Sequence, residues 1–301
     1  MKSFQALAVY LAVVCLGAAA LAPWVYLVAQ KLAVQFSVFD VLAGQPFHRY
    51  VNRCLYAAAL AGLWPLLRRL GLRSIREIGF ANPIQNWRRA FAGFGIGFAT
   101  LASVATLALL SGARQPNAQL NLQELASHLI NATTSCLAVA VLEEFLFRGV
   151  VFGGLRKSVV PAIALILSSA LYSAVHFYER PPTPEHITWA SGFETFGLMF
   201  HGITKTQTLI PGFFSLLIAG GILCWSYHST GTLWFSVGLH AGWVFWLKSY
   251  AKLTQEAPGY HESLWGTNKL YDGWIAFGSI GLTALLLRWR FPPPRGVIQW
   301  K

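Results

Sequence analysis

Three ionisable residues interrupt an otherwise apolar run near the middle of the chain. Glu143, Glu144 and Arg148 lie in the sequence Val-Leu-Glu-Glu-Phe-Leu-Phe-Arg-Gly, with apolar residues on both sides. A charge inside a bilayer costs about 3 kcal/mol or more, and such residues are therefore rare there and usually functional. We interpret this run as the centre of a candidate site.

The spacing of these residues predicts different roles for the two acids. On a helix, Glu144 and Arg148 lie one turn apart with the acid nearer the N-terminus, which is the favourable orientation for an ion pair. Glu143 points about 100° around the helix from Glu144. It is therefore left for another partner, and a carboxylate in a poorly solvated site can act as a general base.

Two further apolar segments carry one histidine each, in Tyr172-Ser-Ala-Val-His176 and in Gly-Leu-His240-Ala-Gly-Trp. In one reading, Glu143 and His176 activate a water molecule while His240 stabilises the developing oxyanion. In the other, Glu143, His176 and His240 bind a zinc ion that carries the water. The residues alone leave both readings open. Lone membrane histidines often only link helices, but three costly groups together favour chemistry.

The composition indicates which class of protein positions these residues. Hydrophobic residues make up 55% of the 301 residues and charged residues 11%, against about 25% charged in soluble proteins. The mean hydropathy is +0.50. We therefore predict an all-α, polytopic bundle of transmembrane helices. The four cysteines are scattered singly, which argues against a disulfide framework or a cysteine zinc site.

The net charge of +12 fits a membrane protein better than a nucleic-acid-binding protein. The basic residues lie in short loops between apolar runs, which is typical of loops that face anionic lipid headgroups. A nucleic-acid interface would need a basic face with polar or aromatic interleaving. We therefore expect the lipid bilayer, and no nucleic acid, as a partner.

Eight apolar segments are predicted to span the bilayer, and the fourth is longer than the ~20 residues that a crossing needs. Glu143 lies on the fourth, His176 on the fifth and His240 on the seventh. Gly93, Gly95 and Gly97 in the third would let another helix approach closely. The approximate bounds of the eight segments are residues 5–30, 50–67, 90–110, 125–155, 159–177, 209–227, 232–250 and 273–287.

The intervening segments complete the predicted organisation. Residues 70–89 have apolar residues at near-helical spacing and are expected to lie on the membrane surface. Residues 111–123, 178–206 and 251–271 are polar connections. We divide the chain into N-terminal membrane helices with the amphipathic segment (1–120), a four-helix catalytic core (121–250), and a loop, a last helix and a cytoplasmic tail (251–301).

The orientation follows from the distribution of basic residues. An even number of spans places both termini on one side, and the loops on that side hold more arginine and lysine. The positive-inside rule then places both termini in the cytoplasm. The alanine-rich, lysine-poor composition leads us to expect a bacterial inner membrane.

The motifs Glu143-Glu144-x-x-x-Arg148, Tyr172-x-x-x-His176 and Gly-Leu-His240-Ala-Gly-Trp resemble the EExxxR, FxxxH and HxxxN motifs of the CPBP family. This family, also called ABI, comprises CAAX-prenyl-protease and bacteriocin-processing intramembrane proteases. The resemblance covers about residues 120–250. It implies a glutamate-dependent intramembrane endopeptidase whose substrate is a membrane-associated or exported protein or peptide. The same resemblance favours the reading without a cofactor over the one with zinc.

The resemblance also implies a role for each residue. Glu143 and His176 would position and deprotonate the attacking water, and His240 would belong to the oxyanion side. Glu144 and Arg148 would support the geometry of the motif helix. By the same resemblance, Tyr172 would form an aromatic wall.

The chain departs from the family motifs at two positions. Tyr172 replaces phenylalanine, which keeps an aromatic side chain, and Val244 replaces asparagine, which removes a hydrogen-bond donor. Either another residue donates the hydrogen bond to the oxyanion, or His240 stabilises the oxyanion alone, or catalysis is weakened. Val244 thus supports an alternative, a non-catalytic immunity or scaffold protein of the same fold. A transporter that uses Glu143 as proton carrier is disfavoured, because no broken helices recur in two halves of the chain.

Overall fold

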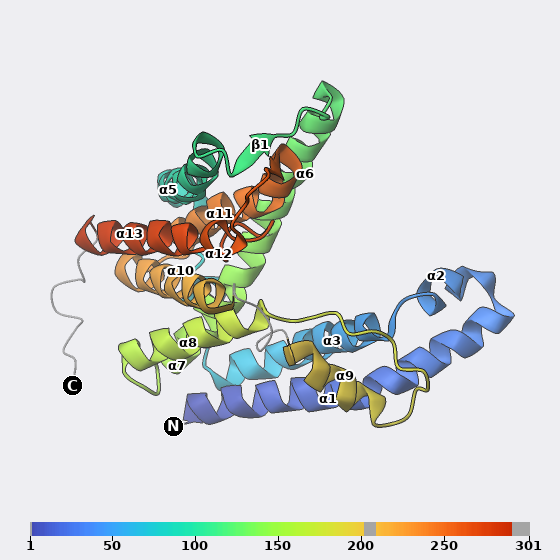
Figure 1. Ribbon diagram of the computed structural model, residues 1–301. Helices are drawn as coiled ribbons and strands as arrows, with labels where there is room; N and C mark the ends of the chain where they lie inside the picture. The colour runs from blue at the N-terminus through green and yellow to red at the C-terminus, as the bar shows by residue number, and fades with distance from the viewer. Residues whose placement is uncertain (1, 202–208, 291–301) are drawn as a thin grey trace. The chain divides into compact units, whose positions relative to one another are not determined.

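The computed structural model describes residues 2–201 and 209–290 and is almost entirely helical (Figure 1). Each of the eight apolar segments forms a helix, which confirms the predicted all-α class. These helices are α1 (Lys2–Gln35), α3 (Phe47–Arg69), α5 (Pro83–Leu110), the α6 segment (Leu122–Glu143, continued to Leu155), α8 (Pro161–Val175), α10 (Leu209–Thr230), α11 (Trp234–Leu253) and α13 (Trp274–Arg290). The last part of the predicted cytoplasmic tail, 291–301, lies outside the described residues.

Three helical stretches in the described part of the chain are long and apolar enough to cross a membrane. They are Ser3–Gln35, Ile75–Leu110 and Leu209–Thr230, and the shorter apolar helix Pro161–Val175 adds to them. The chain is therefore a membrane protein. The total of eight spans and their orientation stay predictions.

The chain forms two compact units whose boundaries differ from those of the three predicted segments. The first unit combines Met1–Arg73 with Val175–Lys205, and the second combines Ser74–Ala174 with Thr206–Lys301.

In the first unit, α1 packs against α3 and α9 (Ser191–Met199). A Cβ atom on Gly192 would lie 1.8 Å from the carbonyl oxygen of Ala19, so only glycine allows this approach of α9 to α1. Between α1 and α3 lie the short helices η1 (Ser37–Phe39) and α2 (Asp40–Ala43). The predicted polar connection 178–206 thus contains a packed helix that its polar composition did not indicate.

In the second unit, α5 and α11 pack through glycines on both helices. A Cβ atom on Gly97 would lie 2.0 Å from the carbonyl oxygen of Leu239, and one on Gly238 would lie 1.9 Å from that of Ala90. Such small-residue contacts are typical of membrane helix pairs. Gly93 also faces α11, but Gly95 has open space beside it, so the prediction is correct for two of the three glycines of α5.

The predicted amphipathic segment 70–89 does not form one surface helix. Ile75–Ile78 forms the short helix α4, and residues 83–89 are the first turns of α5, which begins at Pro83 after a turn at Gly79. The φ of 114° at Gly79 favours glycine. Ile78 is buried, and the backbone N–H of Leu233 donates to the carbonyl oxygen of Gly79 over 2.9 Å. Ile78 therefore serves packing within the second unit, whereas Ile75 is 69% exposed.

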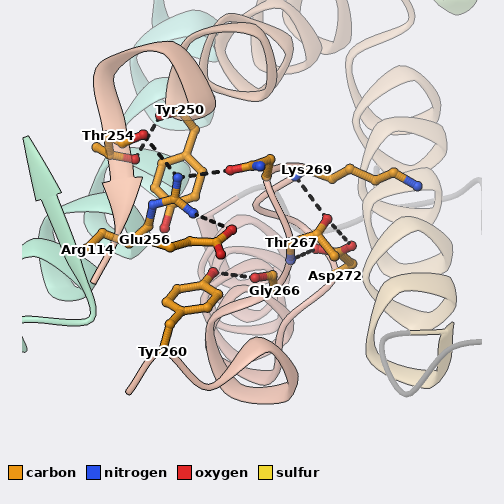
Figure 2. A network of polar contacts seen from close by, with 10 residues as sticks. Arg114, Tyr250, Thr254, Glu256, Tyr260, Gly266, Thr267, Lys269 and Asp272 are labelled. Carbon is orange, nitrogen blue, oxygen red and sulfur yellow. Dashed lines mark hydrogen bonds and ion pairs between the residues drawn. The ribbon is translucent and has the colours of Figure 1, made fainter. Parts of the chain in front are cut away.

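Two of the predicted polar connections pair with each other. Strands β1 (Arg114–Pro116) and β2 (Thr254–Glu256) form an antiparallel pair in which Arg114 is opposite Glu256. The Arg114 guanidinium is buried, donates to the carbonyl oxygen of Thr254 over 3.1 Å and lies 4.4 Å from the centre of the Tyr250 ring (Figure 2). Connections 111–123 and 251–271 therefore lie at the same end of the helices, as the predicted topology requires.

Hydrogen bonds within the loop after β2 hold its shape beside Arg114 (Figure 2). The Asp272 carboxylate accepts hydrogen bonds from the backbone N–H and the hydroxyl of Thr267, at 2.8 and 2.7 Å. The Tyr260 hydroxyl donates to the carbonyl oxygen of Gly266. Burial raises the pKa of Tyr260, so this hydroxyl keeps its proton and its role as donor. The short helix α12 (Glu262–Trp265) lies within this loop.

Candidate active site

The helix that carries the two glutamates changes its winding at the motif. α6 ends at Glu143, residues Glu144–Phe152 form a π-helix (η2), and α7 (Gly153–Leu155) completes the segment. π-helical turns are rare and are frequent at functional sites. Gly149 lets η2 contact α4 closely, because a Cβ atom there would lie 2.3 Å from Cγ2 of Ile78.

Glu144 and Arg148 form the predicted ion pair. The Arg148 NH1 atom lies 2.9 Å from Oε1 of Glu144, and both side chains are fully buried. The Arg148 guanidinium also lies 4.3 Å from the centre of the Tyr172 ring on α8, and its NH2 atom donates to the carbonyl oxygen of Gly220 on α10 over 3.5 Å. Arg148 thus links η2 to two neighbouring helices.

His240 on α11 lies between the two glutamates. Its Nδ1 atom is 3.0 Å from Oε1 of Glu144, and its Nε2 atom is 3.8 Å from Oε2 of Glu143. Because an ionised carboxylate can only accept, Nδ1 is the donor to Glu144. In the neutral ring Nε2 is then an acceptor, and the Tyr172 hydroxyl, 3.3 Å away, donates to it. Glu144 therefore orients His240 in addition to pairing with Arg148, a contact that the sequence analysis did not predict.

The two acids differ in the exposure of their side chains. The Glu143 side chain is 23% exposed, whereas that of Glu144 is fully buried. Part of the Glu143 side chain is therefore open, although its Oε2 atom is buried, whereas Glu144 is enclosed by protein. This difference makes Glu143 the better candidate for a group that acts on a reactant.

Two further predicted residues have different outcomes. His176 directly follows α8, is partly exposed and belongs to the first unit, so its pairing with Glu143 stays a prediction. Val244 is buried on α11, one turn beyond His240, and contributes only an apolar side chain there.

Within the ranges that the structure describes, no cluster of ligands favours the zinc reading. Those residues contain no group of three or more His, Cys, Asp or Glu side chains placed to hold a metal ion. Whether the site requires a metal ion is therefore a question for solution experiments.

Small and hydroxyl-bearing residues of α8 and α10 also support the site, although they were not predicted from the sequence. The Ser168 hydroxyl donates to the carbonyl oxygen of Phe147 in η2 over 3.0 Å. A Cβ atom on Gly220 would lie 2.9 Å from that of Ser169, so α8 and α10 are close at this level. A serine pair in an otherwise apolar helix was the available signal, since buried hydroxyls need hydrogen-bond partners.

The fold and the site together define a helical membrane protein with a buried glutamate–arginine–histidine cluster in its core. Residues 125–246 match the family model described as Rce1-like, Type II CAAX prenyl endopeptidase Rce1-like. This match contains Glu143, His176 and His240 and confirms the resemblance inferred from the motifs.

A curated bacterial protein is also similar. The chain is 24% identical over 262 residues to the uncharacterized protein YyaK of Bacillus subtilis (strain 168), which covers 83% of this chain and 77% of YyaK. No solved structure matches the chain.

Proposed function

We propose that this protein is an intramembrane endopeptidase that hydrolyses a peptide bond in a membrane-associated or exported protein or peptide. One observation carries the proposal: His240 is held by the buried Glu144 at 3.0 Å and presents its other nitrogen toward the accessible Glu143. The Rce1-like match supports a protease with a protein or peptide substrate. The bacterial inner membrane, with both termini in the cytoplasm, is the location we infer.

In the proposed mechanism, Glu143 acts as the general base. Its carboxylate takes a proton from a water molecule, with His176 as the partner that positions the water, and the hydroxide attacks the carbonyl carbon of the scissile bond. The carbonyl oxygen becomes the oxyanion of a tetrahedral intermediate. Glu143 then transfers its proton to the departing amine, which completes hydrolysis without a covalent enzyme intermediate.

The oxyanion needs a hydrogen-bond donor, and Val244 cannot supply one. We assign this role to the Tyr172 hydroxyl on the His240 side of the site. In the resting site this hydroxyl donates to Nε2 of His240, and in the reaction it turns to the oxyanion. Tyr172, which replaces the phenylalanine of the family motif, would thus supply the donor that is lost because Val244 replaces asparagine.

The test compares Glu143→Gln with Glu124→Gln. Glu124 is an exposed acid near the start of the same helix, so it controls for the loss of a carboxylate. Processed protein termini are compared by mass spectrometry in a deletion strain carrying each variant. Glu143→Gln is expected to lower processing at least ~100-fold, since general-base groups contribute this much, while membrane insertion stays normal. Processing at the wild-type rate by Glu143→Gln would contradict the mechanism.

A non-catalytic protein of the same fold is the second candidate, and Val244 is the observation that favours it. A double variant, Glu143→Gln with His176→Ala, would then retain every binding partner of the wild type. This alternative would be supported if the wild type and the double variant captured one partner equally well. It also requires that wild type and deletion strain show no difference in processed protein termini.

A further inference from the structure

A groove of about 600 Å³ lies between α5 and α13 in the second unit, away from the Glu143 site. At one end the two helices are held together by hydroxyl groups: Thr100 and Thr283 are 3.0 Å apart, and the Ser279 hydroxyl donates to the carbonyl oxygen of Thr100 over 3.0 Å. From there the groove extends along α5 to Ala92, a distance of about 12 Å at the helical rise.

The walls of this groove are apolar. Ile96 and Phe235 line it on one side, and Leu282 and Leu286 line it on the other. The two leucines are 57% and 55% exposed, so no part of the described chain covers them. The groove therefore offers an apolar surface that the described chain leaves uncovered.

The end of the groove opposite the hydroxyl groups is basic. Arg290 lines it there, and an adjoining hollow of about 340 Å³, which shares Ala92 and Phe235 with the groove, is lined by Arg88 and Arg89. No acidic side chain lines either hollow within the described residues. Trp289, 82% exposed beside Arg290, is the kind of residue that lies at a membrane–water interface.

We propose that this groove binds one anionic phospholipid, with an acyl chain along α5 and α13 and the phosphate at Arg88, Arg89 and Arg290. Basic pockets between membrane helices on the cytoplasmic side bind such headgroups, and arginine pairs well with phosphate oxygens. The predicted topology places this end on the cytoplasmic side. The arginines explain why the lipid is anionic, and the aliphatic walls explain why it is a lipid.

The test measures lipid binding to the full-length protein in neutral detergent by native mass spectrometry. Phosphatidylglycerol and phosphatidylcholine with the same acyl chains are the probes, and inorganic phosphate is the competitor. Arg290→Gln and the pair Arg88→Gln/Arg89→Gln should weaken phosphatidylglycerol binding about fivefold per arginine lost. The matched control is Arg76→Gln, an exposed arginine of α4 outside the groove, which should leave binding unchanged.

A second pair of variants tests the acyl chain. Leu286→Trp fills the groove and should abolish phosphatidylglycerol binding, whereas Leu285→Trp, at a 67% exposed residue that does not line the groove, should not. Equal binding of both lipids, or equal effects of the two tryptophan variants, would overturn the proposal. Full displacement of the lipid by inorganic phosphate would instead identify a phosphate site without a role for the groove. Unchanged melting temperatures verify that each variant is folded.

Discussion

The contact between α5 and α11 gives a prediction in which two neighbouring glycines should respond in opposite ways. Gly97 faces α11, and a Cβ atom there would lie 2.0 Å from the carbonyl oxygen of Leu239, far inside the 3.4 Å at which ordinary contact begins. Gly95 has no atom within 4 Å of its own Cβ position. We therefore expect Gly97→Ala to destabilise the protein and Gly95→Ala to be neutral or stabilising.

The magnitude follows from two opposing terms. Overpacking a close contact costs about 1–3 kcal/mol, and the obstacle at Gly97 is backbone, which cannot rotate away. Replacing glycine by alanine in a helix gains up to about 1 kcal/mol, and both variants receive this gain. The two variants should thus differ by about 2 kcal/mol, which corresponds to a difference in Tm of about 4–8 °C for a protein of this size.

The assay is thermal unfolding of both purified variants in the same detergent, followed by circular dichroism. Leu239 precedes His240, so the displacement of α11 by Gly97→Ala should also disturb the 3.0 Å contact between His240 and Glu144 and lower cleavage activity. A Gly97→Ala protein that melts at or above the temperature of Gly95→Ala would contradict this prediction. It would show that the two helices can separate without cost.

Three further predictions concern the candidate site. Tyr172→Phe should lower the cleavage rate about 100-fold, because it removes the hydrogen-bond donor to the oxyanion. Adding Val244→Asn to the Tyr172→Phe variant should restore part of that rate. If kinetic measurements show no such rescue, they contradict the role of Tyr172 as the oxyanion donor. Arg148→Met leaves Glu144 buried without its counter-charge and should lower the free energy of unfolding by about 3–5 kcal/mol. In denaturation experiments, adding Glu144→Gln to the Arg148→Met variant should recover most of this loss. Equal stability of the single and double variants would contradict the ion pair. Dialysis against a chelator should leave the cleavage rate unchanged; loss of activity that zinc restores would support the metal reading instead.

The parts of the site that lie on one element were predictable from spacing alone. Glu144 and Arg148 are four residues apart, so their ion pair needs only a helical turn, and the structure contains it. The difference between Gly95 and its neighbours was also accessible, because Gly93 and Gly97 share a helix face and Gly95 points away from it. The apolar lengths were likewise sufficient to predict eight helices.

The parts that depend on tertiary packing were not predictable from residue types. The bond between His240 and Glu144 joins α11 to η2, and nothing in the local sequence shows which acid the ring will contact. The pairing of β1 with β2 places Arg114 opposite Glu256 across two connections that were read only as polar. A three-residue strand is too short for any periodicity to be visible.

The ion pair of Glu144 with Arg148 also has a consequence for biosynthesis. His240 lies 96 residues after Glu144 in the chain, and at about 5–20 residues per second the ribosome needs roughly 5–20 s to add it. During that interval the motif segment enters the membrane while its later partner has not yet been made. Arg148 is the counter-charge already present on the same nascent segment. Its first task is therefore to let an acidic helix leave the translocon, and only afterwards does it stabilise the completed site.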